Sequence, residues 1–289
     1  MSEGHSLIKR RLPGRVRPVG STRPKKQRKV DAEQSGARIL QLSDEVLMLI
    51  LKKLTTLELI ILADTCLRLK SLCLETESLW MNPDFSGHPT DLNRMKECLS
   101  EECLNVLNKS TRSLTLEGML MTQGQVMNLS EAYLGNIAKD CPEIRTLRLH
   151  NICFNEGKIL FEHLPSSLTK LSLNASEYSF EKLPDPYLQN IHTKLPNLQE
   201  VNVTDCGWVT DYFLWEICKI ETLKVISIRD NEDCYITKIT KRGISNIIAT
   251  GASHIERLTL VRLHLCDGLL IKMAAEMKIL KYLDVRHSE

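Results

Sequence analysis

Cysteine, histidine and the carboxylates are the residue types that most often carry chemistry in proteins, and this chain of 289 residues has ten cysteines and eight histidines. Zinc sites and dithiol redox centres need ligand pairs such as Cys-x-x-Cys or His-x-x-x-His, and the sequence contains neither. It also lacks Gly-x-Ser-x-Gly, a glycine-rich phosphate loop and His-Glu-x-x-His. The sequence therefore predicts a non-enzymatic protein with no catalytic residues, bound metal or cofactor.

With 43% hydrophobic residues, the chain is long enough for one large domain or two smaller ones. The first residues lack the apolar run of a secretory leader, and no apolar stretch approaches the ~18 residues that a membrane-spanning helix needs. We therefore expect an intracellular chain with no membrane partner, whose reduced cysteines pack mostly as small apolar groups.

The net charge of +2 conceals an uneven distribution. Residues 1–30 carry ten Lys and Arg against one Glu, so that segment is +9 and the remainder of the chain −7. Residues 1–37 have too few apolar residues to form a core and are predicted to be a disordered tail. The cluster Pro24–Val30 resembles a monopartite nuclear import signal, which implies an import receptor as a partner and a nuclear location, with the cytoplasm left open. The side chains that such a receptor would read are Lys25, Lys26, Arg28 and Lys29. A solubilising arm or a nonspecific polyanion binder is the alternative.

The clearest elements of the chain are internal repeats between residues 113 and 289. Seven segments place two apolar residues on either side of one variable residue, and their second members are 24 to 33 residues apart. This alternation predicts short strands with one buried face, and helix-like patterns fill the intervals. The seven pairs are Leu114 and Leu116, Leu147 and Leu149, Leu171 and Leu173, Val201 and Val203, Ile226 and Ile228, Leu258 and Leu260, and Leu283 and Val285.

The spacing averages about 28 residues, inside the ~20–29 residue range of leucine-rich repeats. The run Val201–Asp211 resembles the cysteine-containing subtype of these repeats. The resemblance implies an α/β fold in which a curved solenoid has short parallel strands lining its concave face and helices outside. Cys206 and Cys153 would then lie at the turns after their strands, fill the core and hydrogen-bond to backbone groups.

In such a solenoid the residues flanking each buried pair point to the concave surface, where a partner protein would bind. Both signs of charge occur there, so the sequence does not favour nucleic acid as a partner of this surface. A solvated polar face is the alternative for any single residue. The candidate substrate-binding residues are Arg148, His150, Lys170, Asn174, Asn202, Thr204, Arg229, Arg257 and Arg286.

The stretch Ile39–Trp80 has more apolar residues at helical spacing than a short helical segment can bury by itself. Ser43 is expected to cap its first helix, with two carboxylates following in the first turn. The stretch resembles an F-box, departing from the family pattern at Ser43 for proline, Thr65 for valine and Leu69 for tryptophan. The matching positions are Leu42, Asp44, Glu45, Val46, Leu47, Ile50, Leu51, Leu54, Leu59, Leu62, Cys66, Arg68, Leu72, Leu79 and Trp80.

The F-box resemblance implies docking onto the Skp adaptor, and through it onto the cullin and RING subunits of a ubiquitin ligase. A helical cap on the repeat domain is the alternative role for this stretch. The candidate adaptor-binding residues are Leu42, Val46, Leu47, Ile50, Leu51, Leu54, Leu59, Leu62, Cys66, Leu69, Leu72 and Trp80.

Together these features resemble the F-box and leucine-rich-repeat family. The predicted organisation is a tail at 1–37, an F-box at 38–86, a linker and capping helix at 87–112, and about seven repeats at 113–289. The family implies a substrate-recognition subunit of a Skp–cullin–F-box ligase that holds an unknown target protein for ubiquitination and proteasomal degradation. A nuclear repeat scaffold without ligase function, and a nucleic-acid binder acting through the tail, remain as alternatives.

Overall fold

A computed structural model describes residues 38–86, 106–117, 127–129, 131–154, 161–174, 189–230, 238–250, 252–263 and 265–286. The chain divides into two compact units, residues 1–47 and 48–289. In the first unit, a 3-10 helix η1 (Arg38–Gln41) precedes the start of helix α2 (Asp44–Leu51). The amide of Leu47 donates to the carbonyl of Ser43, 3.0 Å away, so α2 begins where Ser43 and the following two carboxylates were expected to start a helix.

The second unit begins with the end of α2 and two more helices, α3 (Thr56–Ala63) and α4 (Leu67–Glu75), which pack against each other. A capping box starts α3: the amide of Glu58 donates to Thr55 Oγ1 at 3.3 Å, and the amide of Thr55 donates to Glu58 Oε2 at 2.8 Å. A 3-10 helix η2 (Glu77–Trp80) and a two-residue strand β1 (Asp84–Phe85) follow.

An eight-stranded parallel sheet forms the rest of this unit, in the order β1-β2-β4-β6-β7-β8-β9-β10. The strands after β1 are β2 (Ser113–Glu117), β4 (Thr146–His150), β6 (Lys170–Asn174), β7 (Glu200–Thr204), β8 (Val225–Arg229), β9 (Arg257–Val261) and β10 (Tyr282–Asp284). Six of these strands contain both residues of a predicted apolar pair, and β10 contains Leu283 but ends one residue before Val285, which confirms the parallel strands of the α/β fold. Strand β1 was not predicted.

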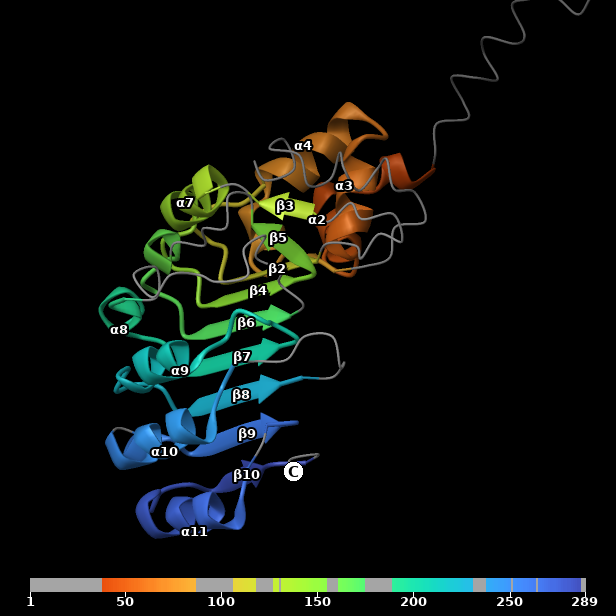
Figure 1. The fold of residues 1–289 in the computed structure, drawn as a ribbon. Coiled ribbons are helices and arrows are strands. Elements are labelled where there is room, and N and C mark those ends of the chain that lie inside the picture. Colours follow the sequence, from red (N-terminus) through yellow and green to blue (C-terminus); the bar gives the residue numbers. More distant parts are fainter. Residues whose placement is uncertain are drawn as a thin grey trace, which may run out of the picture. The chain divides into compact units, whose positions relative to one another are not determined.

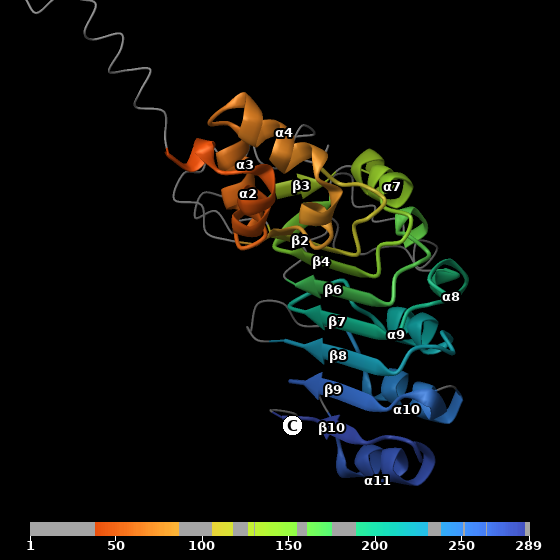
Figure 2. The same ribbon diagram turned by 180° about the vertical axis from the view of Figure 1, so that it is seen from behind.

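Helical segments fill the intervals between the strands. They are α7 (Glu131–Asp140), η4 (Phe161–His163), α8 (Ile191–Lys194), α9 (Asp211–Cys218), α10 (Lys241–Thr250), η6 (Ala252–His254) and α11 (Asp267–Glu276). Figures 1 and 2 show α7 to α11 stacked in chain order along one side of the sheet. A separate two-stranded parallel sheet pairs β3 (Met127–Leu129) with β5 (Ile152–Phe154).

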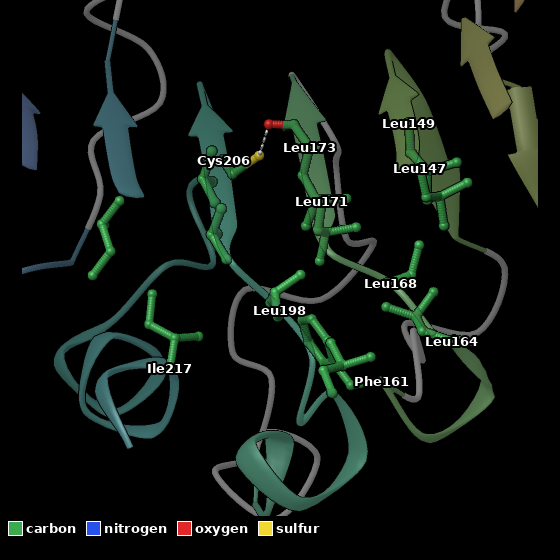
Figure 3. Close-up of a cluster of buried hydrophobic side chains, with 14 of the residues drawn as sticks. Leu147, Leu149, Phe161, Leu164, Leu168, Leu171, Leu173, Leu198, Cys206 and Ile217 are labelled. Carbon is green, nitrogen blue, oxygen red and sulfur yellow. Dashed lines mark hydrogen bonds between the residues drawn. The ribbon is translucent and has the colours of Figure 1, made fainter. Parts of the chain in front are cut away.

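The core lies between the sheet and these helices. Of the seven predicted pairs, six are at most 1% exposed, from Leu114 and Leu116 to Leu258 and Leu260. Figure 3 shows side chains of adjacent strands meeting residues such as Phe161 and Ile217 from the helical side. Each fully buried leucine contributes about 1.5–3 kcal/mol, so this repeated burial is the main stabilising term of the unit. The seventh pair differs, since Leu283 on the last strand of the sheet is 38% exposed.

Cys206 has the role expected for it after strand β7. It is fully buried, and its Sγ donates to the carbonyls of Thr204 at 3.2 Å and Leu173 at 3.8 Å (Figure 3). The preceding residue, Asp205, has φ 53°, and its amide donates to the carbonyl of Arg229 in the next strand at 2.9 Å. Asp tolerates this left-handed conformation better than most residues, so the sharp turn costs little. The side chain of Cys153 lies outside the described residues.

A ladder of backbone hydrogen bonds joins the residues that precede the strands. Each amide donates to the carbonyl of the equivalent residue one segment earlier, at 2.7–2.9 Å. The residues of this ladder are Met81, Arg112, Arg145, Thr169, Gln199, Lys224, Glu256 and Lys281. Met81 directly follows η2 and is the first residue of this ladder. The ladder therefore connects the helical segment to the sheet. The helices of residues 48–80 are therefore part of the same packed body as the sheet.

The helix expected at 87–112 lies mostly outside the described residues. Its described part, residues 106–112, forms turns, as a linker does. The amide of Asn108 donates to Thr111 Oγ1 at 3.2 Å, and the amide of Ser110 donates to Asn108 Oδ1 at 2.8 Å. Such local side-chain bonds compete with the helical pattern for the backbone donors.

Candidate functional site

Large apolar side chains are exposed on three successive helices of the second unit. Leu49 and Ile50 on α2 are 66% and 37% exposed, Ile61 on α3 is 43%, and Leu67 and Leu74 on α4 are 86% and 40%. We call these five residues the apolar helical surface. Helix α3 shows why they stay exposed: Leu59 and Ala63 already face the core, and Glu58 is its only charged residue. Apolar residues are therefore left for its other face, and exposed apolar residues mark interaction sites when they form a contiguous patch.

The structure separates the twelve predicted adaptor-binding residues into three groups. Val46 and Ile50 are exposed, while Leu42, Leu54, Leu62, Cys66 and Leu72 are half-buried. The remaining five, Leu47, Leu51, Leu59, Leu69 and Trp80, are at most 3% exposed. These five stabilise the helices from inside and present no surface in this structure, which differs from the expectation that they contact an adaptor. Conversely, the predicted adaptor-binding residues did not include the exposed Leu49, Ile61, Leu67 and Leu74. For Ile61, the nearly continuous apolar composition of α3 was a signal.

Trp80 is the centre of the junction between the helices and the sheet. Its side chain is fully buried, and Nε1 donates to the carbonyl of Cys73 on α4 at 2.7 Å. Its own carbonyl accepts a hydrogen bond from the hydroxyl of the fully buried Thr111 at 2.9 Å. The amide of Asp84 in β1 donates to Thr56 Oγ1 on α3 at 2.8 Å. These bonds fix α3 and α4 to the first strands, so the orientation of the apolar helical surface relative to the sheet is defined.

The second candidate site is the face of the sheet opposite to the buried pairs, here called the polar face. Strand register places its residues in rows, because neighbouring strands pair without offset. The central row runs Thr115, Arg148, Ser172, Asn202, Ser227, Thr259 and Asp284. Apart from Arg148, these side chains are short, so a partner can approach the sheet closely along this row.

The nine predicted substrate-binding residues belong to this polar face, with Arg286 two residues beyond β10. Several of the charged ones have partners on the same face. Lys170 Nζ lies 2.9 Å from Glu200 Oε2, and Glu200 Oε1 also accepts from Asn202 Nδ2 at 2.9 Å. Burial acts to raise the pKa of Glu200, but the hydrogen bonds from Asn202 and Lys170 hold it below its usual value. Glu200 is therefore charged at neutral pH and offsets Lys170.

His150 lies beside Ser172 on the neighbouring strand, with Nε2 3.3 Å from Ser172 Oγ. Burial lowers the pKa of His150, with Glu117 acting in the opposite direction, so the ring is neutral at pH 7. A neutral imidazole beside a hydroxyl can exchange donor and acceptor roles, which suits the binding of a polar group on a partner.

On the helical side, Glu216 of α9 is a buried carboxylate with three hydrogen bonds. Its side chain is 3% exposed and accepts from Lys219 Nζ at 2.6 Å, His192 Nδ1 at 3.2 Å and the amide of Asn190 at 3.1 Å. Lys219 Nζ also lies 3.1 Å from the ring centroid of the exposed Trp215. Burial would raise the pKa of Glu216, but the bonds from Lys219 and His192 lower it overall.

The lowered pKa of Glu216 predicts a loss of stability in acid. A carboxylate whose pKa is depressed on folding stabilises the protein fully above its unfolded pKa, near 4.5, and this contribution is lost as the pH falls through the folded pKa. We expect Glu216→Gln to be less stable than the parent at pH 7 by about 1.5–3 kcal/mol, because Lys219 loses its charged hydrogen-bond partner. The difference in melting temperature should shrink between pH 5 and pH 3. A constant difference over that range would contradict this role.

Three further sequence predictions concern nuclear import, a bound metal and a membrane partner. The import cluster Lys25, Lys26, Arg28 and Lys29 lies outside the described residues. Within the described ranges, no group of three or more His, Cys, Asp or Glu side chains is arranged to hold a metal ion. No helix among the described residues combines the length and apolar character needed to span a membrane.

Compared with models of protein families and with curated proteins, the chain matches none of them. Its functional assignment therefore rests on the residues and geometry given above.

Proposed function

We propose that this protein is the substrate-recognition subunit of a Skp–cullin–F-box ubiquitin ligase. The observation that carries the proposal is the apolar helical surface on α2, α3 and α4, exposed next to a packed sheet. An exposed leucine at 86%, such as Leu67, gains about 1.5–3 kcal/mol when a partner covers it. The resemblance of residues 39–80 to an F-box names the Skp adaptor as that partner.

The sheet supports the second half of the proposal. Seven strands at the predicted apolar pairs, each followed by a helical segment or a turn, are compatible with leucine-rich repeats. On this interpretation the polar face is the surface that holds the target. Its side chains stand on a regular sheet, so little conformational entropy is lost when a folded partner binds.

In this proposal the ligase promotes catalysis by placing the reacting groups next to each other. The adaptor, cullin and RING subunits bring a charged ubiquitin carrier close to a lysine of the bound target, which raises the effective concentration of the reacting groups. The chain itself contributes no reacting residue. Its contribution is rigidity, because Trp80 and Met81 connect the helices directly to the strand ladder.

Co-purification tests the proposal. The full-length chain, expressed together with the Skp adaptor, should retain the adaptor through affinity purification, and addition of the cullin and RING subunits should give a complex that transfers ubiquitin. A chain that folds but retains no adaptor would overturn the ligase assignment. A repeat scaffold without ligase function would then be the better account.

We further propose that the basic cluster Pro24–Val30 directs the protein to the nucleus. Replacing Lys25 and Lys26 by alanine should shift a fluorescent fusion of the full chain from nucleus to cytoplasm. An unchanged nuclear signal would show that another segment, or a partner, carries the import information.

A further inference from the structure

The charges on the polar face are unevenly distributed between its two ends. On strands β1 to β7 the described residues of this face include Asp84, Glu117 and Glu200 against Arg148 and Lys170, a balance of −1. From β8 onwards the described residues of this face include three arginines, Arg229, Arg257 and Arg286, and one carboxylate, Asp284, a balance of +2. We call these three residues the arginine cluster. They come from β8, β9 and the residues after β10, which are neighbouring segments of one sheet, with Arg257 at the start of its strand and Arg229 at the end of its own.

One member of the cluster is held in place by a buried acid. The side chain of Asp284 is 5% exposed and accepts hydrogen bonds from Arg286 Nε at 2.9 Å and from Arg286 Nη2 at 2.8 Å. The bond with Arg286 lowers the pKa of Asp284 to about 2, so this carboxylate stays charged at every physiological pH. The Arg286 side chain is still 69% exposed, and a guanidinium has five N–H donors. Donors of Arg286 therefore remain directed to solvent.

The other two arginines differ in exposure, since Arg257 is exposed and Arg229 is half-buried. Arg229 donates from Nε to Ser227 Oγ at 3.1 Å, which orients the side chain without neutralising it. Its charge also helps to lower the pKa of Asp284. Arg257 is exposed and makes no ion pair with any described residue. Tyr282, 51% exposed, lies opposite Arg257 in the strand register and adds an aromatic ring to the same surface.

We infer that the arginine cluster binds an acidic peptide segment of the target protein. Carboxylates pair with guanidinium groups through two parallel hydrogen bonds, and three arginines on a fixed sheet present such groups at set positions. Ser227 and Thr259 lie in the row between them and have short side chains, so a peptide chain can lie close to the sheet. A balance of only +2 is small for nucleic acid, whose binding relies on many phosphate contacts. This inference rests on the proposed function, since it names the kind of target segment that the polar face holds.

Fluorescence anisotropy with the full-length chain tests the inference. The probe is a labelled peptide of alternating Glu and Ala, and the matched control probe has Gln in place of Glu. The variant Arg229→Gln/Arg257→Gln removes two charges of the cluster, while Lys241→Gln/Arg242→Gln removes two charges from exposed positions of α10, outside the polar face. Arg286 is left unchanged, because its removal would leave the buried Asp284 without its partner.

We expect the Glu peptide to bind and the Gln peptide not to bind at the same concentration. The double variant in the cluster should weaken binding about tenfold or more, since charge-assisted hydrogen bonds are worth about 1.5–3 kcal/mol each. The control variant should weaken it less than threefold. Equal weakening by both variants, equal binding of both peptides, or tighter binding of a single-stranded oligonucleotide would overturn the inference.

Adaptor binding is measured on the same proteins, which separates this inference from the proposed function. Loss of peptide binding with retained adaptor binding would remove only the acidic-peptide inference. Peptide binding without adaptor binding would leave the cluster as a binding site and remove the ligase assignment.

Discussion

Replacing Trp80 by alanine is expected to lower the free energy of unfolding by about 3–5 kcal/mol, the usual cost of truncating a buried aromatic residue. The side chain is fully buried, so the variant leaves a large cavity between α4 and the first strands. It also leaves the carbonyl of Cys73 without the hydrogen bond that Nε1 supplies at 2.7 Å. Both losses weaken the contact between the helices and the first strands.

Denaturant unfolding of the full chain measures this effect, with two controls in the same protein. Trp80→Phe fills most of the space and should cost less than Trp80→Ala. Trp215→Ala removes a tryptophan that is 41% exposed on α9, and should cost about 1 kcal/mol through its contact with Lys219. Similar losses for Trp80→Ala and Trp215→Ala would show that Trp80 does not stabilise a junction.

The second large effect concerns adaptor binding, which Leu67→Asp should weaken about tenfold to a hundredfold. The variant removes an apolar contact worth about 1.5–3 kcal/mol and places a charge in the proposed interface. Leu67 is the first residue of α4, where a carboxylate interacts favourably with the helix dipole. The helix should therefore persist, so that weaker binding reports on the surface itself. Titration calorimetry with the purified adaptor gives the dissociation constant.

Ile271→Asp is the matched control, since it makes the same kind of change at an apolar residue that is 70% exposed on α11, outside the apolar helical surface. It should bind the adaptor as the parent does. Leu47→Asp is unsuitable for this purpose because Leu47 is 1% exposed, and a buried charge there would disrupt the helix before any interface. If Leu67→Asp and Ile271→Asp had the same affinity for the adaptor, the exposed apolar residues of α2, α3 and α4 would not be the docking site.

The strands of the sheet were predictable from the sequence because each one repeats the same physical requirement. Two apolar residues flank one polar residue, as in Val201 and Val203, and only a strand with one buried face satisfies that pattern. The buried role of Cys206 was predictable for a related reason, since it follows its strand at the turn. Strand β1 has only the two residues Asp84 and Phe85, too few to show any alternation.

The apolar helical surface was harder to predict residue by residue. Helix α3 reads Thr-Leu-Glu-Leu-Ile-Ile-Leu-Ala, in which apolar residues occupy nearly every position. A periodicity of 3.6 residues cannot separate a buried side from an exposed one in such a segment. Burial was decided by tertiary contacts, which placed Leu59 inside and Ile61 outside. The arginine cluster likewise depends on strand register, which brings together residues up to 57 positions apart in the chain.

Hydrogen exchange of the full-length chain with and without the Skp adaptor tests the central claim most directly. The account predicts slower amide exchange in α2, α3 and α4 when the adaptor is bound, with exchange in strands β4 to β9 unchanged. Protection confined to the strands, or no protection at saturating adaptor, would contradict it.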